Sequence, residues 1–95
     1  MDEMFYRKSM EAEGISPNAI ATRISKGNKV EEILKVSMDI VVASDDLMYN
    51  SLLILKQNEN PRNAPLSNSL RKYYLYKNKR DFPRLQNYKS NHSFL

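Results

Sequence analysis

The chain has 95 residues, contains no cysteine and carries a net charge of +4. This length allows a single domain with a modest core, and the lack of cysteine excludes disulfide bonds and thiolate metal sites. No apolar run approaches the roughly 18 residues that a membrane-spanning helix needs. The N-terminus opens with Asp2 and Glu3 instead of a basic targeting region. We therefore expect a soluble, cytoplasmic protein.

Charge is divided unevenly between the two halves of the chain. Residues 1–48 hold six Lys and Arg against nine Asp and Glu, a net charge of −3, whereas residues 49–95 hold nine against two, a net charge of +7. A basic half of this kind favours a polyanionic partner. Nucleic acid is the first candidate, and an acidic protein surface is the second.

The most completely specified element is a short helix over residues 16–26, which a helix over residues 2–13 precedes. Ser16 is a suitable N-cap, and Pro17 suits the first helical position, where its missing N–H costs nothing. Gly27 supplies the left-handed residue that commonly ends a helix. The helix should therefore be only about two and a half turns long.

This short helix has two unlike edges. Ile20 and Ile24 form a narrow apolar edge, whereas the opposite edge is small and polar, with Asn18, Ala21, Thr22 and Ser25. Asparagine pairs bidentately with adenine, and a threonine methyl group meets the thymine methyl group. We therefore predict base contacts by Asn18, Ala21 and Thr22, and phosphate contacts by Ser16, Arg23 and Lys26. A plain capped helix in a small bundle is the alternative interpretation.

A recognisable pattern surrounds this helix, at Gly14-Ile15-Ser16, Ile20, Arg23-Ile24, Lys26-Gly27 and Glu31-Glu32-Ile33-Leu34. Over residues 6–34 it resembles the helix-turn-helix of small bacteriophage and mobile-element DNA-binding proteins. The resemblance implies a transcriptional regulator in a bacterial host cell, with double-stranded DNA as its partner and residues 15–26 in the major groove. So short a recognition helix contacts only about four base pairs, which is too few for useful affinity. We therefore also expect a homodimer.

The middle of the chain predicts two further helices. Residues 29–43 carry apolar side chains at helical spacing and would complete a three-helix unit over residues 1–44, although alternation within residues 36–43 leaves a strand open. Ser44 can cap a helix over residues 45–57, which we assign to dimerisation. Residues 58–66 contain two prolines and predict a loop.

The C-terminal half predicts a basic helix and a tail. A helix capped by Ser67 or Asn68 should run to about Asn78, within a basic, tyrosine-rich segment over residues 67–85, and residues 86–95 should be a mobile tail. Its cations would hold phosphates: Arg71, Lys72, Lys77, Lys79, Arg80 and Arg84. Three rings, Tyr73, Tyr74 and Tyr76, would stack on bases or form a protein interface, or instead pack partly on the core.

Catalysis finds little support in the sequence. The sole histidine, His92, lies in the predicted tail, and the only glycines are Gly14 and Gly27, too few for a phosphate loop. Asp45 and Asp46 are explained by helix capping, without a metal. We predict no enzyme activity, no cofactor and no bound metal.

Together these patterns predict a mainly α protein, a small helical bundle with an N-terminal helix-turn-helix and a basic C-terminal helix. The predicted function is DNA binding in transcription regulation. The alternative is a phage-encoded inhibitor that binds a host protein with an acidic surface through the basic, tyrosine-rich segment.

Overall fold

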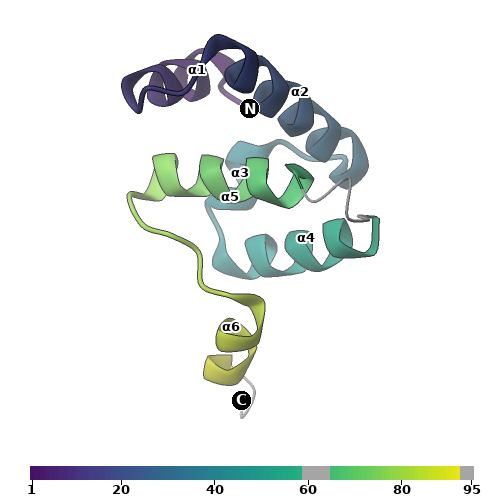
Figure 1. Ribbon diagram of the computed structural model, residues 1–95. Helices are drawn as coiled ribbons and strands as arrows, with labels where there is room; N and C mark the ends of the chain where they lie inside the picture. Colours follow the sequence, from purple (N-terminus) through teal and green to yellow (C-terminus); the bar gives the residue numbers. More distant parts are fainter. Residues whose placement is uncertain (59–64, 93–95) are drawn as a thin grey trace.

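The computed structural model describes residues 1–58 and 65–92 and contains six helices over these ranges, without a strand (Figure 1). The helices are α1 (Glu3–Ala12), α2 (Pro17–Leu34), α3 (Met38–Val42), α4 (Asp45–Asn58), α5 (Pro65–Asn78) and α6 (Leu85–His92). The prediction of a mainly α, small helical bundle is confirmed.

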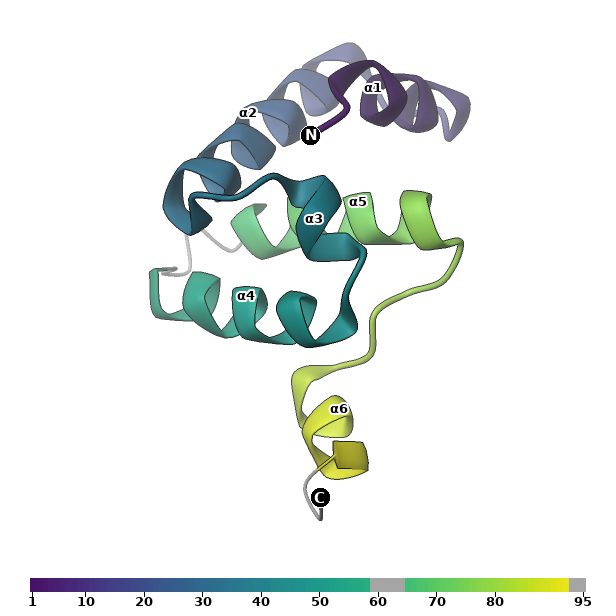
Figure 2. The ribbon, with the colours of Figure 1, turned by 180° about the vertical axis from the view of Figure 1, so that it is seen from behind.

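The central element is α5. It packs against α1, α2, α3 and α4, and Figures 1 and 2 show α1 and α2 on one side of it and α4 on the other. Three of its side chains, Leu70, Tyr73 and Tyr74, have no exposed surface. The basic helix of the sequence is therefore also the main source of aromatic core.

The turn between α1 and α2 depends on Gly14, whose φ of 84° lies in the left-handed region. The Gly14 N–H donates to the carbonyl of Glu11 (3.0 Å) and the Ile15 N–H donates to that of Met10 (3.1 Å). These two bonds form a Schellman motif, which satisfies the last carbonyls of α1. Ser16 then caps α2 by accepting from the Ala19 N–H (3.3 Å), as predicted.

The predicted helix end at Gly27 is wrong, because α2 continues to Leu34. Gly27 is buried inside the helix, and an added Cβ would lie 3.0 Å from Met1 Sδ and 3.1 Å from Met38 Cε. The absence of a side chain at Gly27 makes room for the ends of the Met1 and Met38 side chains; it does not serve a left-handed turn. Lys35 takes the left-handed position, with a φ of 58°.

The single helix predicted over residues 29–43 is also wrong. Its first residues belong to α2, and a sharp turn separates them from the short α3, which Ser37 caps. The strand considered for residues 36–43 is excluded, because residues 38–42 are helical. The Glu31 carboxylate holds this turn by accepting from the Met38 N–H (2.8 Å).

The second predicted N-cap, Ser44, is confirmed, because its Oγ accepts from the Leu47 N–H at the start of α4 (3.3 Å). Most of the predicted loop over residues 58–66 lies outside the described residues. The next helix, α5, begins at Pro65, two residues before the predicted cap.

The mobile tail predicted from residue 86 contains a helix that the sequence did not predict, since Leu85–His92 form α6. Tyr88 anchors this helix, with its ring stacked on Tyr49 of α4 at a centroid distance of 4.9 Å and beside Phe82 at 5.3 Å. The Tyr88 hydroxyl donates to the Asp46 carboxylate. The remaining tail residues, 93–95, lie outside the part that the structure describes.

Candidate nucleic-acid interface

The N-terminal half of α2 presents a polar face on the outside of the bundle. Asn18, Ala21, Thr22 and Ser25 are all exposed, while Ile20 and Ile24 on the opposite edge are buried. Because α1 and α5 pack on α2, its backbone is braced from behind. The two edges predicted from sequence are thus present in the folded protein.

Thr22 has a defined orientation on this face. Its hydroxyl donates to the carbonyl of Asn18 one turn earlier (3.0 Å). This bond occupies the hydroxyl proton, which leaves the exposed side chain to offer its methyl group and an acceptor oxygen. Asn18 is exposed and makes no side-chain hydrogen bond to the described residues. Both side chains can therefore contact a ligand without breaking a contact inside the protein.

Five of the six residues predicted for α2 line one hollow of about 500 Å³ on this face. They are Ser16, Asn18, Thr22, Arg23 and Lys26; Ala19 and Asn68, from the first turns of α2 and α5, complete the lining. The sixth, Ala21, is exposed but lies outside the hollow. No carboxylate is among the lining residues. We call the hollow and the exposed residues Asn18, Ala21 and Thr22 the α2 face.

The two cations of the α2 face form no ion pair with any residue in the described ranges. Both Arg23 and Lys26 are half-buried. The Arg23 carbonyl accepts from Ser69 Oγ (2.8 Å), which fixes this turn of α2 to α5. The backbone that carries Arg23 is therefore fixed by the fold, and neither cation forms an ion pair among the described residues.

The cations of α5 are in a different situation, because most are paired with the chain's own carboxylates. Lys72 lies 2.6 Å from the carboxylate of Glu13, at the end of α1, and the Tyr76 hydroxyl donates to the same group (3.2 Å). One carboxylate thus receives one cation and one phenol hydroxyl. We call such a group a carboxylate trio.

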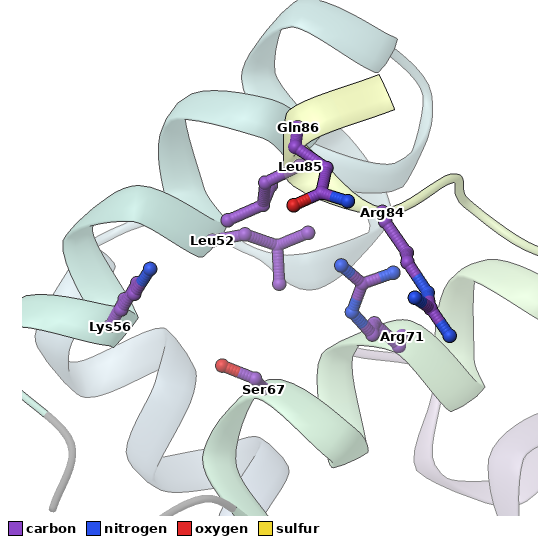
Figure 3. A pocket seen from close by; sticks show the side chains of 7 residues that line it. All are labelled: Leu52, Lys56, Ser67, Arg71, Arg84, Leu85 and Gln86. Atoms are coloured by element: carbon purple, nitrogen blue, oxygen red, sulfur yellow. The ribbon is translucent and has the colours of Figure 1, made fainter. Parts of the chain in front are cut away.

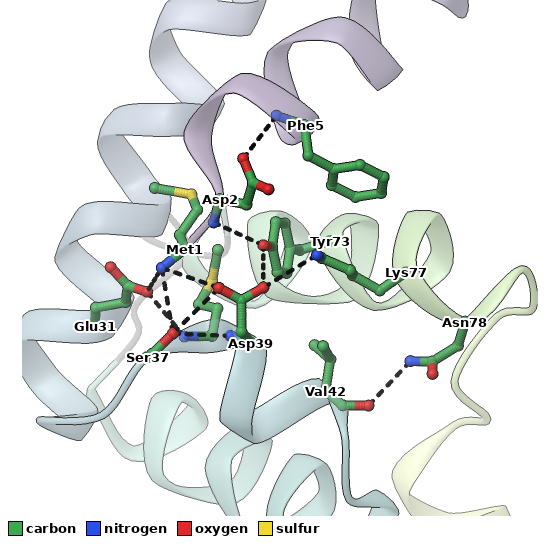
Figure 4. A network of polar contacts seen from close by, with 11 residues as sticks. Met1, Asp2, Phe5, Glu31, Ser37, Asp39, Val42, Tyr73, Lys77 and Asn78 are labelled. Atoms are coloured by element: carbon green, nitrogen blue, oxygen red, sulfur yellow. Dashed lines mark hydrogen bonds and ion pairs between the residues drawn. The ribbon is translucent and has the colours of Figure 1, made fainter.

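A second carboxylate trio is built on Asp39 of α3 (Figure 4). Its carboxylate accepts from the Tyr73 hydroxyl and lies 3.3 Å from Lys77 Nζ. The Tyr73 oxygen in turn accepts from the Asp2 N–H (2.8 Å), and the Met1 ammonium lies 3.5 Å from Asp39. This network joins the first residues, α3 and α5.

The third carboxylate trio involves Asp45 at the start of α4. It accepts from the Tyr74 hydroxyl (2.7 Å) and lies 3.2 Å from Arg80. The remaining α5 cation, Arg71, donates to the carbonyls of Phe82 (3.0 Å) and Pro83 (3.3 Å). The acidic and basic halves of the sequence therefore bind each other within one molecule.

These trios shift the pKa values of their members. The hydrogen bond from Lys72 lowers the pKa of Glu13. Burial acts to raise the pKa of Asp39, but the hydrogen bonds from Tyr73 and Lys77 outweigh it and lower that pKa. Burial and the bond to Asp45 raise the pKa of Tyr74 to about 12. The trios are thus arranged for ionised carboxylates and neutral phenols.

The structure corrects the role predicted for the tyrosines. Tyr73 and Tyr74 are fully buried, so they cannot stack on bases or meet a protein partner. Tyr76 is half-buried, and its hydroxyl is bound to Glu13. The alternative function, inhibition of a host protein, therefore loses the aromatic contacts predicted for it.

The predicted phosphate contacts divide in the same way. Arg71, Lys72, Lys77 and Arg80 all have partners inside the protein, whereas Lys79 and Arg84 are exposed without an ion pair among the described residues. Sequence reasoning missed the carboxylates that neutralise α5. The available signal was the excess of acidic residues in the first half of the chain, where nine Asp and Glu face six Lys and Arg.

In the described ranges, no three His, Cys, Asp or Glu side chains gather closely enough to hold a metal ion. Within the same ranges, no helix is long and apolar enough to cross a bilayer.

No protein-family model matches this chain, and no curated protein or solved structure matches it either. Its function is therefore inferred from the arrangement of its own residues.

Proposed function

We propose that this protein is a small DNA-binding protein of the bacteriophage helix-turn-helix type that regulates transcription. The observation that carries the proposal is the α2 face, where Asn18 and Thr22 are exposed one turn apart and Arg23 and Lys26 lie beside them without an ion pair to any residue that the structure describes. Small polar side chains let a helix approach base edges, and flanking cations hold the phosphates.

The proposal assigns roles by chemistry. Asn18 pairs with adenine, and the outward methyl groups of Ala21 and Thr22 meet thymine methyl groups. Arg23 and Lys26 neutralise backbone phosphates, and the exposed cations Lys79 and Arg84 are available for further electrostatic attraction. The protein acts by binding, without catalysis or a cofactor.

A homodimer through α4 completes the proposal. Leu47 and Ile54 are two turns apart on α4, and each is 44 % exposed, so two copies could bury them against each other. The N-terminal half of α2 lies on the far side of α5 from α4 (Figure 1). A dimer formed through α4 therefore leaves both α2 faces outward to contact two half-sites.

The test is sequence-specific binding to duplex DNA. A preferred site is first selected from a random duplex pool, and fluorescence anisotropy then compares the protein with Asn18→Ala/Thr22→Ala. We expect the double substitution to reduce the preference for the selected site by about 1 to 3 kcal/mol per lost base contact, while binding to unrelated duplex persists.

Asn87→Ala is the matched control, because Asn87 is an exposed asparagine on α6, away from both the α2 face and the exposed apolar residues of α4. It should leave site preference unchanged. If no duplex is enriched in the selection, or if Asn18→Ala/Thr22→Ala retains full preference, α2 does not read DNA and the proposal fails.

A further inference from the structure

A second hollow, on the other flank of α5, gathers cations that neither the carboxylate trios nor the α2 face uses. It has a volume of about 430 Å³ and lies between α4, α5 and α6 (Figure 3). Lys56 of α4, Arg71 of α5 and Arg84, just before α6, contribute one cation each. Three separate segments of the chain thus place positive charge around one space.

The described residues that line this hollow include no carboxylate. Asp81 acts electrostatically on Arg71, but it is not part of the lining. Neither Lys56 nor Arg84 forms an ion pair within the described ranges. This differs from the rest of α5, where Glu13, Asp39 and Asp45 neutralise the cations. Like charges held near one another repel, and a bound anion would relieve that repulsion.

Arg71 is held in place for such an anion. Its Nη1 donates to the carbonyls of Phe82 and Pro83, and the guanidinium also lies over the Phe82 ring at 5.9 Å. The Arg71 and Arg84 side chains lie side by side in the lining of the hollow (Figure 3). A guanidinium fixed in this way loses little conformational entropy when it binds an oxyanion with its fork of donors.

The remaining lining narrows the class of ligand. Leu52 and Leu85 form an apolar wall opposite the two arginines (Figure 3), and the volume lies within the range of small-molecule sites. Three cations suit a group that carries close to two negative charges, as a phosphate monoester does near neutral pH. The apolar wall suits an organic substituent on that phosphate.

We propose that this hollow binds the phosphate group of a small organic phosphate monoester, with Arg71, Arg84 and Lys56 around the phosphate and Leu52 and Leu85 against the organic part. The site is separate from the α2 face, since no residue lines both hollows. Loss of base contacts by the α2 face would therefore leave phosphate binding in this second hollow intact.

The test is an NMR titration of the full chain with phenyl phosphate and, separately, with inorganic phosphate, at constant ionic strength set with sodium chloride. We expect saturable shifts of the Leu52 and Leu85 amide signals, with tighter binding of phenyl phosphate because its ring contacts the leucines. Arg84→Gln and Lys56→Gln should each weaken phenyl phosphate binding by about tenfold or more.

Lys79→Gln is the matched control, because Lys79 is an exposed cation at the end of α5 that does not line the hollow. It should leave the affinity unchanged. The proposal is overturned if neither phosphate produces saturable shifts, or if Arg84→Gln behaves like Lys79→Gln. Displacement of phenyl phosphate by duplex DNA would assign the hollow to backbone phosphates and overturn the small-molecule ligand.

Discussion

The α2 face and the outer side of α5 both carry lysine and arginine side chains, but these cations differ in whether they form ion pairs inside the protein. Lys72 and Lys77 of α5, and Arg80 just beyond it, each lie within 3.3 Å of a carboxylate. On the α2 face, Arg23 and Lys26 meet none among the described residues. In the sequence, α5 is the more basic of the two helices, yet its charges are largely neutralised in the fold.

The difference shows that a block of charge in a sequence is not the same as a charged surface. A carboxylate trio uses one acidic residue, one lysine or arginine and one tyrosine to join α5 to α1, α3 or α4. Such residues stabilise the bundle, whereas the smaller cluster of cations on α2 has no ion pair among the described residues. Four tests of this difference between the α5 and α2 cations follow, from the largest expected effect to the smallest.

The largest effect is expected from Tyr73→Ala. Tyr73 is fully buried, its ring meets those of Phe5 and Tyr6 edge-on, and its hydroxyl binds Asp39. Removing it should lower the free energy of unfolding by about 3 to 5 kcal/mol, measured by urea denaturation. Tyr76→Ala should cost clearly less, because Tyr76 is only half-buried. Equal costs would contradict the difference in burial between the two rings.

Extremes of pH should weaken the carboxylate trios from both sides. The lowered pKa values of Glu13 and Asp39 mean that their contribution to stability is complete above about 4.5 and is lost as the pH falls further. The raised tyrosine pKa values, about 12 for Tyr74 and Tyr88, stabilise the fold below about 10, and this contribution is lost as the pH rises towards 12.

Urea denaturation across the pH range measures the loss of stability at both acid and alkaline pH. Tyr74→Phe removes one of the phenols and should make the alkaline loss of stability shallower. A free energy of unfolding that stays constant between pH 10 and 12 would show that the phenols titrate alike in the folded and unfolded chain, against the contacts seen here.

Two charge-matched double substitutions compare α2 with α5 directly. Arg23→Gln/Lys26→Gln should flatten the dependence of log K on log [salt] for duplex DNA by about 2, since each phosphate contact contributes about 0.9. Lys72→Gln/Lys77→Gln removes the same net charge but should leave the slope nearly unchanged and reduce stability by up to about 1 kcal/mol per ion pair. Equal slopes for the two variants would refute the division.

The smallest effect concerns the two glycines that position the α2 face. Gly14→Ala should cost about 1 kcal/mol, because its positive φ is unfavourable for a residue with a Cβ. Gly27→Ala should change stability by less than about 1 kcal/mol, because the gain in helix propensity offsets a small displacement of the flexible Met1 and Met38 ends. Thermal unfolding measures both, and a larger cost at Gly27 would show that the methionines cannot move.

Sequence reasoning succeeded where the signal lies within one or two turns of chain. Ser16 and Ser44 were predicted as N-caps, and each accepts the expected backbone N–H. It failed at Gly27, because a glycine needed for close packing looks the same in sequence as a glycine that ends a helix. It also failed at α6, whose helical state depends on Tyr88 packing against Tyr49 and Phe82.

The candidate site follows the same rule. The exposed and buried edges of α2 follow from its helical periodicity, so Asn18 and Thr22 could be assigned to the outside from the sequence. The state of the α5 cations could not be assigned, since Lys72 meets a carboxylate 59 residues away. Helical periodicity predicts which face of a helix a side chain occupies, but it does not predict which residues of a distant segment pack against that face.

The sequence by itself determined the helical class, the caps and the outward edge of α2, because these depend on dihedral preferences and on neighbours within a few residues. Only the tertiary structure decided that α5 is the centre of the bundle, that its basic charges are paired, and that Lys56, Arg71 and Arg84 share one hollow. The physical reason is range: a charge is paired or left free by groups within about 4 Å, and in this protein those groups come from other helices.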